Sequence, residues 1–398
     1  MRTLDYDVVV IGAGPAGSQA ARFAAKGGAR TLLIEKRQEI GSPVRCGEGI
    51  SKEWLPSVEI PYDKRYVAHE VDGAVIVSPA GYKVYIDALH AGNEVGCVLE
   101  RDHFDKFIAL LAARAGADIM IKTSATSLVK GDNGFTGVRA KVMGEPIEIR
   151  AKVIVAADGF ESQVGRWAGI DTILPPKDVI STLQYRLGDI AIDPKYCEFH
   201  IGKKVSTGGY AWIFPKSDDV ANVGLGVQLS KIKDPLEARR LLDKFIDSMP
   251  GLKKGEKLDM VAGAVSISAP LDRNVSQNVM IVGDAARVVD AITGGGISHA
   301  CITGMYAGIT AAEAIKANDN SEKFLQKYEE RWRAKLESKL YRDWMAKEKL
   351  ASLDDSVLDR IVKIISESKL GHLSVYSLLM AIKEKDPELV KEFEHLLM

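Results

Sequence analysis

Cysteine is scarce in this chain of 398 residues, which has only four, at positions 46, 97, 197 and 301. They form no CxxC pair and no spacing typical of a metal site, so we predict neither a bound metal nor a short redox motif. A reducing cytoplasm is the simplest setting for so few cysteines, although their positions leave a disulfide between distant cysteines open.

An excess of one charge and a long apolar run are also missing. Lys and Arg number 53 against 54 Asp and Glu, a net charge of −1, so no basic field predicts a nucleic-acid partner. No stretch reaches the roughly 20 apolar residues of a membrane-spanning helix, and Asp5 and Asp7 do not fit the apolar core of a signal peptide. We therefore expect a cytoplasmic protein of two or three domains that could contact a membrane only peripherally.

Glycines at the N-terminal end predict a dinucleotide-binding unit. The sequence reads DVVVIGAGPAGSQAARFAAKGGARTLLIEK, in which an apolar strand over 8–11 precedes a helix over 18–26 and a second strand over 31–34. Gly12, Gly14 and Gly17 form the G-x-G-x-x-G pattern between strand and helix. Glu35 at the end of the second strand suits ribose hydroxyls and argues against a 2′-phosphate. A plain glycine-rich turn is the alternative, which this complete context disfavours.

Two later motifs favour FAD over NAD. Asp158 and Gly159 follow an apolar strand, and Gly283 and Asp284 follow another. Glycines at 294–296 then precede a helix predicted over 296–317. An aspartate there suits a ribityl or ribose hydroxyl, and three glycines allow the backbone to pack on a flat ring. The positive end of the helix would stabilise negative charge at the edge of a flavin.

Together these motifs resemble the FAD-binding proteins of the p-hydroxybenzoate hydroxylase superfamily over about residues 5–315. The resemblance implies an α/β fold, α+β overall. It combines a discontinuous Rossmann-like FAD-binding domain, an inserted antiparallel β-sheet substrate domain and a helical C-terminal region. We assign 1–60, 96–170 and 272–317 to the FAD-binding domain, 61–95 and 171–271 to the substrate domain, and 318–398 to the helical region.

The same resemblance implies which residues contact FAD. Arg101 matches a superfamily arginine at the start of a helix, although a solvated arginine at a helix cap is the plainer interpretation. The full set comprises Gly12, Gly14, Pro15, Ala16, Gly17, Glu35, Lys36, Arg45, Cys46, Gly47, Arg101, Ala125, Asp158, Gly159, Gly283, Asp284, Gly295, Gly296 and Ile297.

Three aromatic residues narrow the family further. Tyr210, Trp212 and Phe214, in GGYAWIFPK, fall on one face of a predicted strand. Such a stripe forms either ordinary sheet core or the apolar wall of a binding site. With the glycines at 224 and 226 the pattern is similar to that of the geranylgeranyl reductase family, although Thr207 stands where that family commonly has proline. The RCGEG segment, the chain length and the helical C-terminal region look like the archaeal digeranylgeranylglycerophospholipid reductases.

That family resemblance implies the saturation of C=C bonds in geranylgeranyl chains of archaeal membrane lipid precursors, with FAD carrying the redox chemistry. The segment containing the three predicted catalytic residues, Cys46, Gly47 and Glu48, would then lie beside the flavin and the isoprenoid substrate. Cys46 is a candidate proton donor, since a free thiol has a pKa of roughly 8.5, or it is a small packing residue. Glu48 is a second candidate acid, and with Arg45 it could instead form an ion pair or meet a polar head group.

Several alternatives stay open at this point. A flavin-dependent monooxygenase would share every FAD motif, and a non-catalytic prenyl-binding carrier on the same fold would bind no flavin. The electron donor is either a ferredoxin-like protein or a reduced nicotinamide. The apolar residues between Leu350 and Ile365, at helical spacing, dock onto the body, close one end of a lipid cavity or touch a bilayer.

Overall fold

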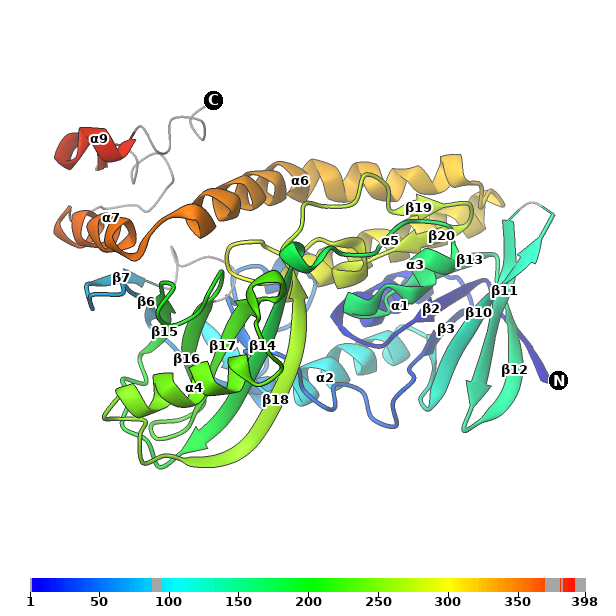
Figure 1. Cartoon of the computed structure of the whole chain (residues 1–398). Helices are drawn as coiled ribbons and strands as arrows, with labels where there is room; N and C mark the ends of the chain where they lie inside the picture. Colours follow the sequence, from blue (N-terminus) through cyan, green and yellow to red (C-terminus); the bar gives the residue numbers. More distant parts are fainter. Residues whose placement is uncertain (1, 88–94, 133, 369–379, 381, 391–398) are drawn as a thin grey trace.

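The computed structural model describes residues 2–87, 95–132, 134–368, 380 and 382–390. A six-stranded sheet in the order β19-β20-β13-β2-β3-β9 forms one half of the molecule (Figure 1). We call it the nucleotide-binding half because it contains the predicted dinucleotide-binding unit. All neighbours in it are parallel except β19 and β20. Its strands are β2 (Val8–Ile11), β3 (Thr31–Ile34), β9 (Asp118–Met120), β13 (Val153–Ala156), β19 (Val275–Ser276) and β20 (Val279–Ile281).

Helices cover this sheet and pack tightly on each other. They are α1 (Pro15–Lys26), α2 (Arg101–Arg114) and α5 (Ile297–Ala317). A Cβ on Gly304 would lie 2.1 Å from the carbonyl oxygen of Ala16, and one on Gly308 would lie 2.4 Å from that of Ala20. Because real Cβ atoms never come so close, only glycine in α5 permits this crossing with α1.

Helix α1 begins three residues before the start predicted from the sequence. The prediction placed its first residue at Ser18, whereas the structure starts it at Pro15 with Gly14 as the N-cap. Proline is favoured at the first helical position because its fixed φ suits the helix and its missing N–H would have no partner there. The N-terminus of α1 therefore lies directly against the glycine turn.

A second sheet of four strands flanks the nucleotide-binding half, in the order β1-β12-β11-β10. β1 runs parallel to β12, and the other pairs are antiparallel. Its strands are β1 (Arg2–Asp5), β10 (Thr123–Gly131), β11 (Gly134–Val142) and β12 (Glu145–Arg150). Figure 1 shows them at the opposite end of the molecule from α7.

The other half is a seven-stranded sheet in the order β18-β14-β17-β16-β15-β6-β7. Its pairs are antiparallel apart from β15 with β6. Helix α4 (Glu237–Ser248) packs on one face and buries a separate apolar core. The strands are β6 (Gly73–Val77), β7 (Lys83–Asp87), β14 (Val179–Gly188), β15 (Tyr196–Ile201), β16 (Tyr210–Pro215), β17 (Ala221–Gln228) and β18 (Glu256–Ser266). The predicted combination of a Rossmann-like sheet with an antiparallel sheet is thus confirmed.

Smaller elements join the two halves. A three-stranded sheet contains β4 (Gly49–Ile50), β5 (Val67–Glu70) and β8 (Cys97–Leu99). Short helical segments are α3 (Gln163–Trp167) and the 3₁₀ turns η1 (Leu55–Val58), η2 (Lys64–Tyr66), η3 (Gly159–Glu161), η4 (Pro176–Asp178), η5 (Leu229–Lys231) and η6 (Gly283–Ala286).

The C-terminal region begins with α6 (Glu322–Ser352), which runs along the top of both halves in Figure 1 and leads into α7 (Asp355–Glu367). A short helix, α9 (Pro387–Val390), follows. The remainder of the predicted helical region 318–398 lies partly outside the described residues. Among the described helices none has the length and apolarity needed to cross a membrane.

Candidate active site

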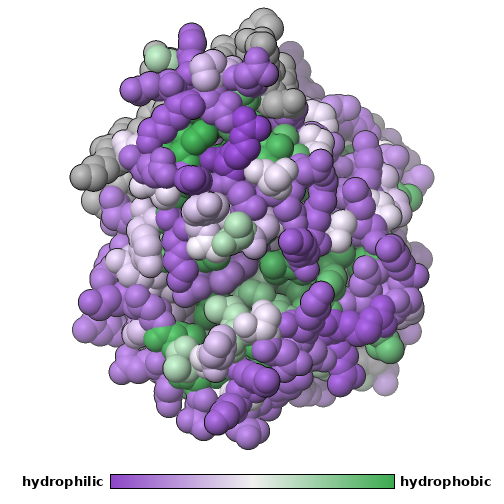
Figure 2. Space-filling view, turned by 60° about the vertical axis from the view of Figure 1, so that its left-hand side comes forward, coloured by the Kyte–Doolittle hydropathy of each residue, from purple (hydrophilic) through white to green (hydrophobic). Residues whose placement is uncertain are grey.

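A cavity of about 290 Å³ lies where the seven-stranded sheet meets the nucleotide-binding half. Its lining comes from the Cys46–Ile50 segment, the sheet strands β14 to β18, the loop 291–298 and the junction of α6 and α7. Figure 2 brings forward the side of the molecule that carries α7 and the seven-stranded sheet, and it shows apolar side chains gathered in a hollow with hydrophilic rims. The cavity can therefore receive a largely apolar ligand.

The aromatic stripe forms one wall of this cavity. Tyr210, Trp212 and Phe214 line it together with Phe199 of β15. Ring centroids lie 5.9 Å apart for Tyr210 and Trp212, and 5.2 Å apart for Phe199 and Phe214. Trp212 and Phe214 also belong to a small buried apolar cluster. The stripe is thus part of the sheet core and also one wall of the cavity.

The two glycines after the stripe make room for their neighbours. A Cβ on Gly224 would lie 2.4 Å from the Trp212 indole, and one on Gly226 would lie 2.5 Å from a methyl group of Ile180. Since these contacts are far below van der Waals distance, glycine at both positions is what lets the Trp212 ring and Ile180 lie flat on the sheet.

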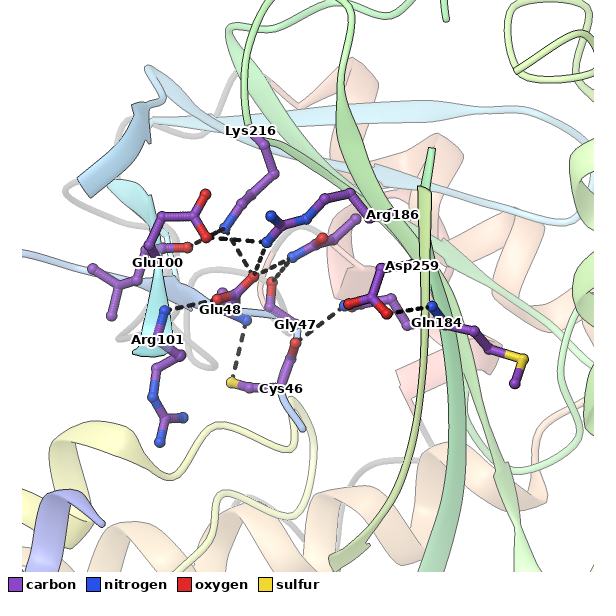
Figure 3. A network of polar contacts seen from close by, with 12 residues as sticks. Cys46, Gly47, Glu48, Glu100, Arg101, Gln184, Arg186, Lys216 and Asp259 are labelled. Atoms are coloured by element: carbon purple, nitrogen blue, oxygen red, sulfur yellow. Dashed lines mark hydrogen bonds and ion pairs between the residues drawn. The ribbon is translucent and has the colours of Figure 1, made fainter. Parts of the chain in front are cut away.

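Polar groups of the sheet hold the segment that contains Cys46 (Figure 3). The side-chain amide of Gln184 donates to the carbonyl of Cys46 at 3.2 Å and accepts from the Trp212 indole at 2.9 Å. Asn222 donates to the carbonyl of Gly47 at 3.2 Å. A Cβ on Gly47 would lie 3.1 Å from the Phe214 ring. Glycine at 47 therefore lets this segment lie against the aromatic wall.

Glu48 is buried at the centre of a network of donors. It adopts the left-handed backbone conformation, with φ of 75°, which is unusual for a residue with a side chain. The main-chain N–H of Arg101 donates to Oε1 at 2.8 Å. Asn222, Lys216 and Arg186 donate to Oε2 at 2.7, 2.8 and 3.3 Å. These four donors match an ionised carboxylate, which only accepts hydrogen bonds.

Lys216 is the most enclosed cation of this network, with 3% of its side chain exposed. Besides Glu48 it contacts Glu100 at 3.1 Å and donates to the carbonyl of Leu99. Glu100 also forms an ion pair with Arg186 at 3.1 Å. Two carboxylates and two cations thus face each other across the junction of the two halves, which satisfies the requirement that buried charges be paired.

The Cys46 thiol lies beside the Arg101 guanidinium and accepts the main-chain N–H of Glu48 at 3.2 Å. Burial raises the pKa of Cys46, and the nearby Arg101 charge opposes that rise. The thiol is therefore protonated at neutral pH. Arg101 is not a solvated helix cap: its guanidinium pairs with Asp105 at 2.9 and 3.0 Å, and only 16% of its side chain is exposed.

A second cavity of about 170 Å³ lies at the N-terminus of α1 and is lined by Gly14, Glu35, Arg45 and Arg101, among others. A Cβ on Gly12 would lie 2.3 Å from the carbonyl oxygen of Ala157, and one on Gly17 would lie 1.8 Å from that of Gly12. A Cβ on Gly14, by contrast, would have no atom of the described residues within 4 Å. The glycine pattern therefore closes the turn and leaves the helix end accessible.

The carboxylate of Glu35 accepts hydrogen bonds from the main-chain N–H groups of Ala13 at 3.0 Å and Arg37 at 2.9 Å. These contacts fix its position at the edge of the second cavity. Arg45 lines both cavities, so they meet at this residue. An elongated ligand could occupy the two together.

The loop before α5 borders the larger cavity through Gly294, Gly295, Gly296 and Ile297. Gly294 has φ of +72°, and a Cβ on Gly296 would lie 3.2 Å from Oδ1 of Asp284. Gly296 is the N-cap of α5 and brings no side chain to the helix end. Two helix N-termini, of α1 and α5, thus open on the two cavities, an arrangement that suits a long ligand carrying negative charge at two points. FAD, with its pyrophosphate and its ring, fits these residues.

Other predicted cofactor residues lie away from the cavity linings. Lys36 is exposed, and Ala125 is half-buried on β10. Asp158 accepts from the main-chain N–H of Val164 at 2.8 Å, and its buried Oδ1 has no hydrogen-bond partner among the described residues. Gly159 follows it with φ of +75°. Gly283, with φ of +63°, packs against Ala16, which follows the helix-starting Pro15.

Several residues of the site were missed by the sequence reasoning. They are Glu100, Gln184, Arg186, Phe199, Lys216 and Asn222. Period-two alternation along β14 puts Gln184 on the cavity side, but no local motif marks it. The lysine directly after the aromatic stripe was a visible signal for Lys216. The four cysteines, in contrast, are all free, and across the described residues no group of three or more metal-ligating side chains is placed to hold an ion.

Two family models match the chain. The model described as geranylgeranyl reductase catalytic domain matches residues 178–265, and that described as FAD dependent oxidoreductase matches residues 7–208. A digeranylgeranylglycerophospholipid reductase of Thermoplasma volcanium is 50% identical over 394 residues, covering 98% of this chain and 99% of the relative. The chain belongs to the digeranylgeranylglycerophospholipid reductase family. A family member from Picrophilus torridus is 47% identical and covers 99% of this chain and all of the relative.

Solved structures agree with this family assignment. A geranylgeranyl bacteriochlorophyll reductase-like protein from Thermoplasma acidophilum superposes with a TM-score of 0.93 at 48% identity, covering 99% of this chain and 100% of the other. A variant of a flavin-dependent brominase, at 20% identity and a TM-score of 0.69 over 96% of this chain, shares the fold. The predicted FAD cofactor and the predicted class of flavin-dependent oxidoreductase are confirmed by the matching family model.

Proposed function

We propose that this protein uses FAD to saturate isolated C=C bonds in the geranylgeranyl chains of archaeal membrane lipid precursors. The observation that carries the proposal is the apolar cavity, in which the aromatic wall, the Cys46 thiol and the glycine loop before α5 face one space. Residues 178–265, which supply most of that wall, match the geranylgeranyl reductase catalytic domain. When bound and reduced, FAD supplies the hydride for one alkene carbon.

The residues that would hold FAD follow the two cavities. Gly12, Gly14 and the N-terminus of α1 would receive the pyrophosphate, and Glu35 the adenosine ribose. Arg45 lines both cavities and Arg101 lines the second one, and both would neutralise phosphate charge. Gly295, Gly296 and Ile297 would border the ring. The remaining predicted contacts are proposed with them: Pro15, Ala16, Gly17, Lys36, Cys46, Gly47, Ala125, Asp158, Gly159, Gly283 and Asp284.

Cys46 would donate the proton that completes the reduction. Its thiol lines the cavity and remains protonated because burial raises its pKa. An isolated alkene has no carbonyl group to polarise, so transfer of this proton to one alkene carbon would leave positive character on the other carbon, which receives the hydride. Aromatic faces attract such positive charge, and Tyr210, Trp212 and Phe214 line the same space. The apolar lining also excludes water, which keeps the thiol the nearest acid.

Glu48 takes a different role from the one its acidity suggested. All four groups bound to its carboxylate are donors, so no proton is stored there for an alkene. We propose that Glu48 positions the segment carrying Cys46, and that Gly47 permits its close approach to Phe214. Of the three predicted catalytic residues, Cys46 alone would then touch the reacting atoms as an acid.

The proposed partners are an isoprenoid lipid and an electron donor, either a ferredoxin-like protein or a reduced nicotinamide. Peripheral contact with a membrane would give the lipid access to the cavity. The decisive experiment reduces the FAD-loaded protein without oxygen, adds digeranylgeranylglycerophospholipid and analyses the lipid by mass spectrometry. Each saturated bond adds two hydrogen atoms. Oxygenated products formed only in air would instead identify a monooxygenase, and an unchanged lipid beside a still-reduced flavin would reject the proposal.

A further inference from the structure

The glycine loop before α5 is organised around one buried carboxylate, that of Asp290. Oδ1 accepts from the main-chain N–H groups of Ile292 at 2.9 Å and Thr293 at 3.1 Å. The main chain of Asp290 closes the same loop, because its N–H donates to Gly295 at 2.9 Å and its carbonyl accepts from Gly294 at 2.8 Å. The conformation of the loop therefore depends on where this side chain is held.

Lys339 holds Asp290 from outside the loop. Its Nζ lies 2.5 Å from Oδ2 of Asp290 and 2.6 Å from Oδ2 of Asp343 one helical turn further along α6. Only 7% of the Asp290 side chain is exposed, so its charge needs a partner. Lys339 lowers the pKa of Asp290 against the effect of burial. The ion pair thus fixes the loop to a long helix that also lines the far end of the cavity with Leu350.

A second tether reaches the loop from the seven-stranded sheet. The hydroxyl of Tyr210, in the aromatic wall, donates to the carbonyl of Thr293. The loop is therefore held by a helix of the C-terminal region and by a strand of the seven-stranded sheet. Without these two tethers the glycines would give the loop many accessible conformations, because glycine has no Cβ to restrict its backbone. Gly294, for example, has φ of +72°.

We propose that Lys339 is a positioning residue for the flavin: through Asp290 it holds the glycine loop in the shape that receives the isoalloxazine ring. The inference rests on the FAD placement proposed above and extends it to a residue that lines neither cavity. Without the lysine charge, Asp290 would turn toward water, and its hydrogen bonds to Ile292 and Thr293 would be lost. The main-chain N–H groups at the N-terminus of α5 would then no longer face the ring in a fixed arrangement.

The test compares FAD-loaded Lys339→Met with wild type in the absence of any lipid. Release of FAD is followed by flavin fluorescence, and the visible absorption spectrum and midpoint potential of the bound flavin are recorded. We expect about tenfold weaker FAD binding, as for the loss of one charge-assisted hydrogen bond, together with a changed spectrum and potential. Lys339→Arg, which keeps the charge, should restore most of these properties.

Arg331→Met is the matched control. Arg331 lies on the same helix and pairs with Glu313 of α5 at 2.8 Å, but it does not contact the loop. It should lower the melting temperature without altering the flavin. The proposal is overturned if Lys339→Met keeps wild-type FAD affinity, spectrum and potential, or if the two variants change the flavin equally. Because no prenyl substrate is used, a failure of the proposed lipid reduction would not affect this outcome.

Discussion

Replacing Lys216 with methionine should destabilise the protein by about 3 kcal/mol, because it removes the cation enclosed between Glu48 and Glu100. Its Nζ lies 2.8 Å from Glu48 and 3.1 Å from Glu100, in a side chain that is 3% exposed. Removing one partner of a buried ion pair typically costs about 3–5 kcal/mol. The lower end applies here, since Glu48 keeps three other donors and Glu100 keeps Arg186.

Calorimetry of the FAD-loaded protein measures this loss. An unfolding entropy of about 2.1 cal/mol/K per residue corresponds to about 0.8 kcal/mol/K for the 398-residue chain unfolding as one unit. A loss of about 3 kcal/mol should therefore lower the Tm by about 4 °C. The flavin should remain bound, because Lys216 lines neither cavity.

Arg186→Met provides the comparison. Arg186 contacts the same Glu48 oxygen at 3.3 Å and Glu100 at 3.1 Å, but 31% of its side chain is exposed. Solvent screening limits such a pair to about 1 kcal/mol, which corresponds to a shift of about 1 °C. Equal shifts for the two variants, or a Lys216→Met Tm within about 1 °C of wild type, would refute the argument that burial decides the strength of this network.

Three further predictions concern single side chains. Cys46→Ala should bind FAD, and its flavin should be reduced normally, but the prenyl lipid should reoxidise that flavin about 10²–10⁴-fold more slowly than in wild type. Cys46→Ser should recover little of this rate. Reoxidation rates within a few-fold of wild type would make Cys46 a packing residue. Trp212→Ala should change the product distribution, because it alters which double bonds are reduced. It should cost less stability than the roughly 3–5 kcal/mol typical of truncating a core aromatic side chain. A large drop in Tm with unaltered products would identify Trp212 as plain sheet core. Burial, with a smaller contribution from Lys339, lowers the pKa of His299 to about 4. The unfolded chain binds this proton at higher pH than the folded chain does. In urea unfolding, the free energy of unfolding of wild type should therefore fall by up to about 3 kcal/mol relative to that of His299→Asn as pH falls from about 6.5 to 4. Parallel plots of unfolding free energy against pH for the two proteins would contradict this.

The sequence was most informative where structure is decided locally. The turn at Gly12 and Gly17 depends on contacts that any side chain would block, so its glycine pattern alone predicted the strand, turn and helix. The alternation of Tyr210, Trp212 and Phe214 likewise predicted a shared face, because period two is a property of the strand itself. The start of α1 at Pro15 was missed by three residues, since the glycine pattern was taken as turn throughout.

The network around Glu48 could not be predicted in this way. Its donors Lys216, Arg186 and Asn222 lie more than a hundred residues away along the chain, and their approach depends on the register of three strands. From the sequence alone Glu48 is an acid in a glycine-rich segment, which suggested proton donation. Only the three-dimensional arrangement shows that its lone pairs are already used.

The anchoring of the Cys46 segment by Gln184 and Asn222 limits how this enzyme could be recombined with its relatives. The segment belongs in sequence to the nucleotide-binding half, but its carbonyl groups are hydrogen-bonded by strands of the other half. A chimera that exchanged the seven-stranded sheet alone would leave these carbonyls facing foreign side chains. Substrate preference should therefore transfer between homologues only when residues 45–50 and the seven-stranded sheet are exchanged together.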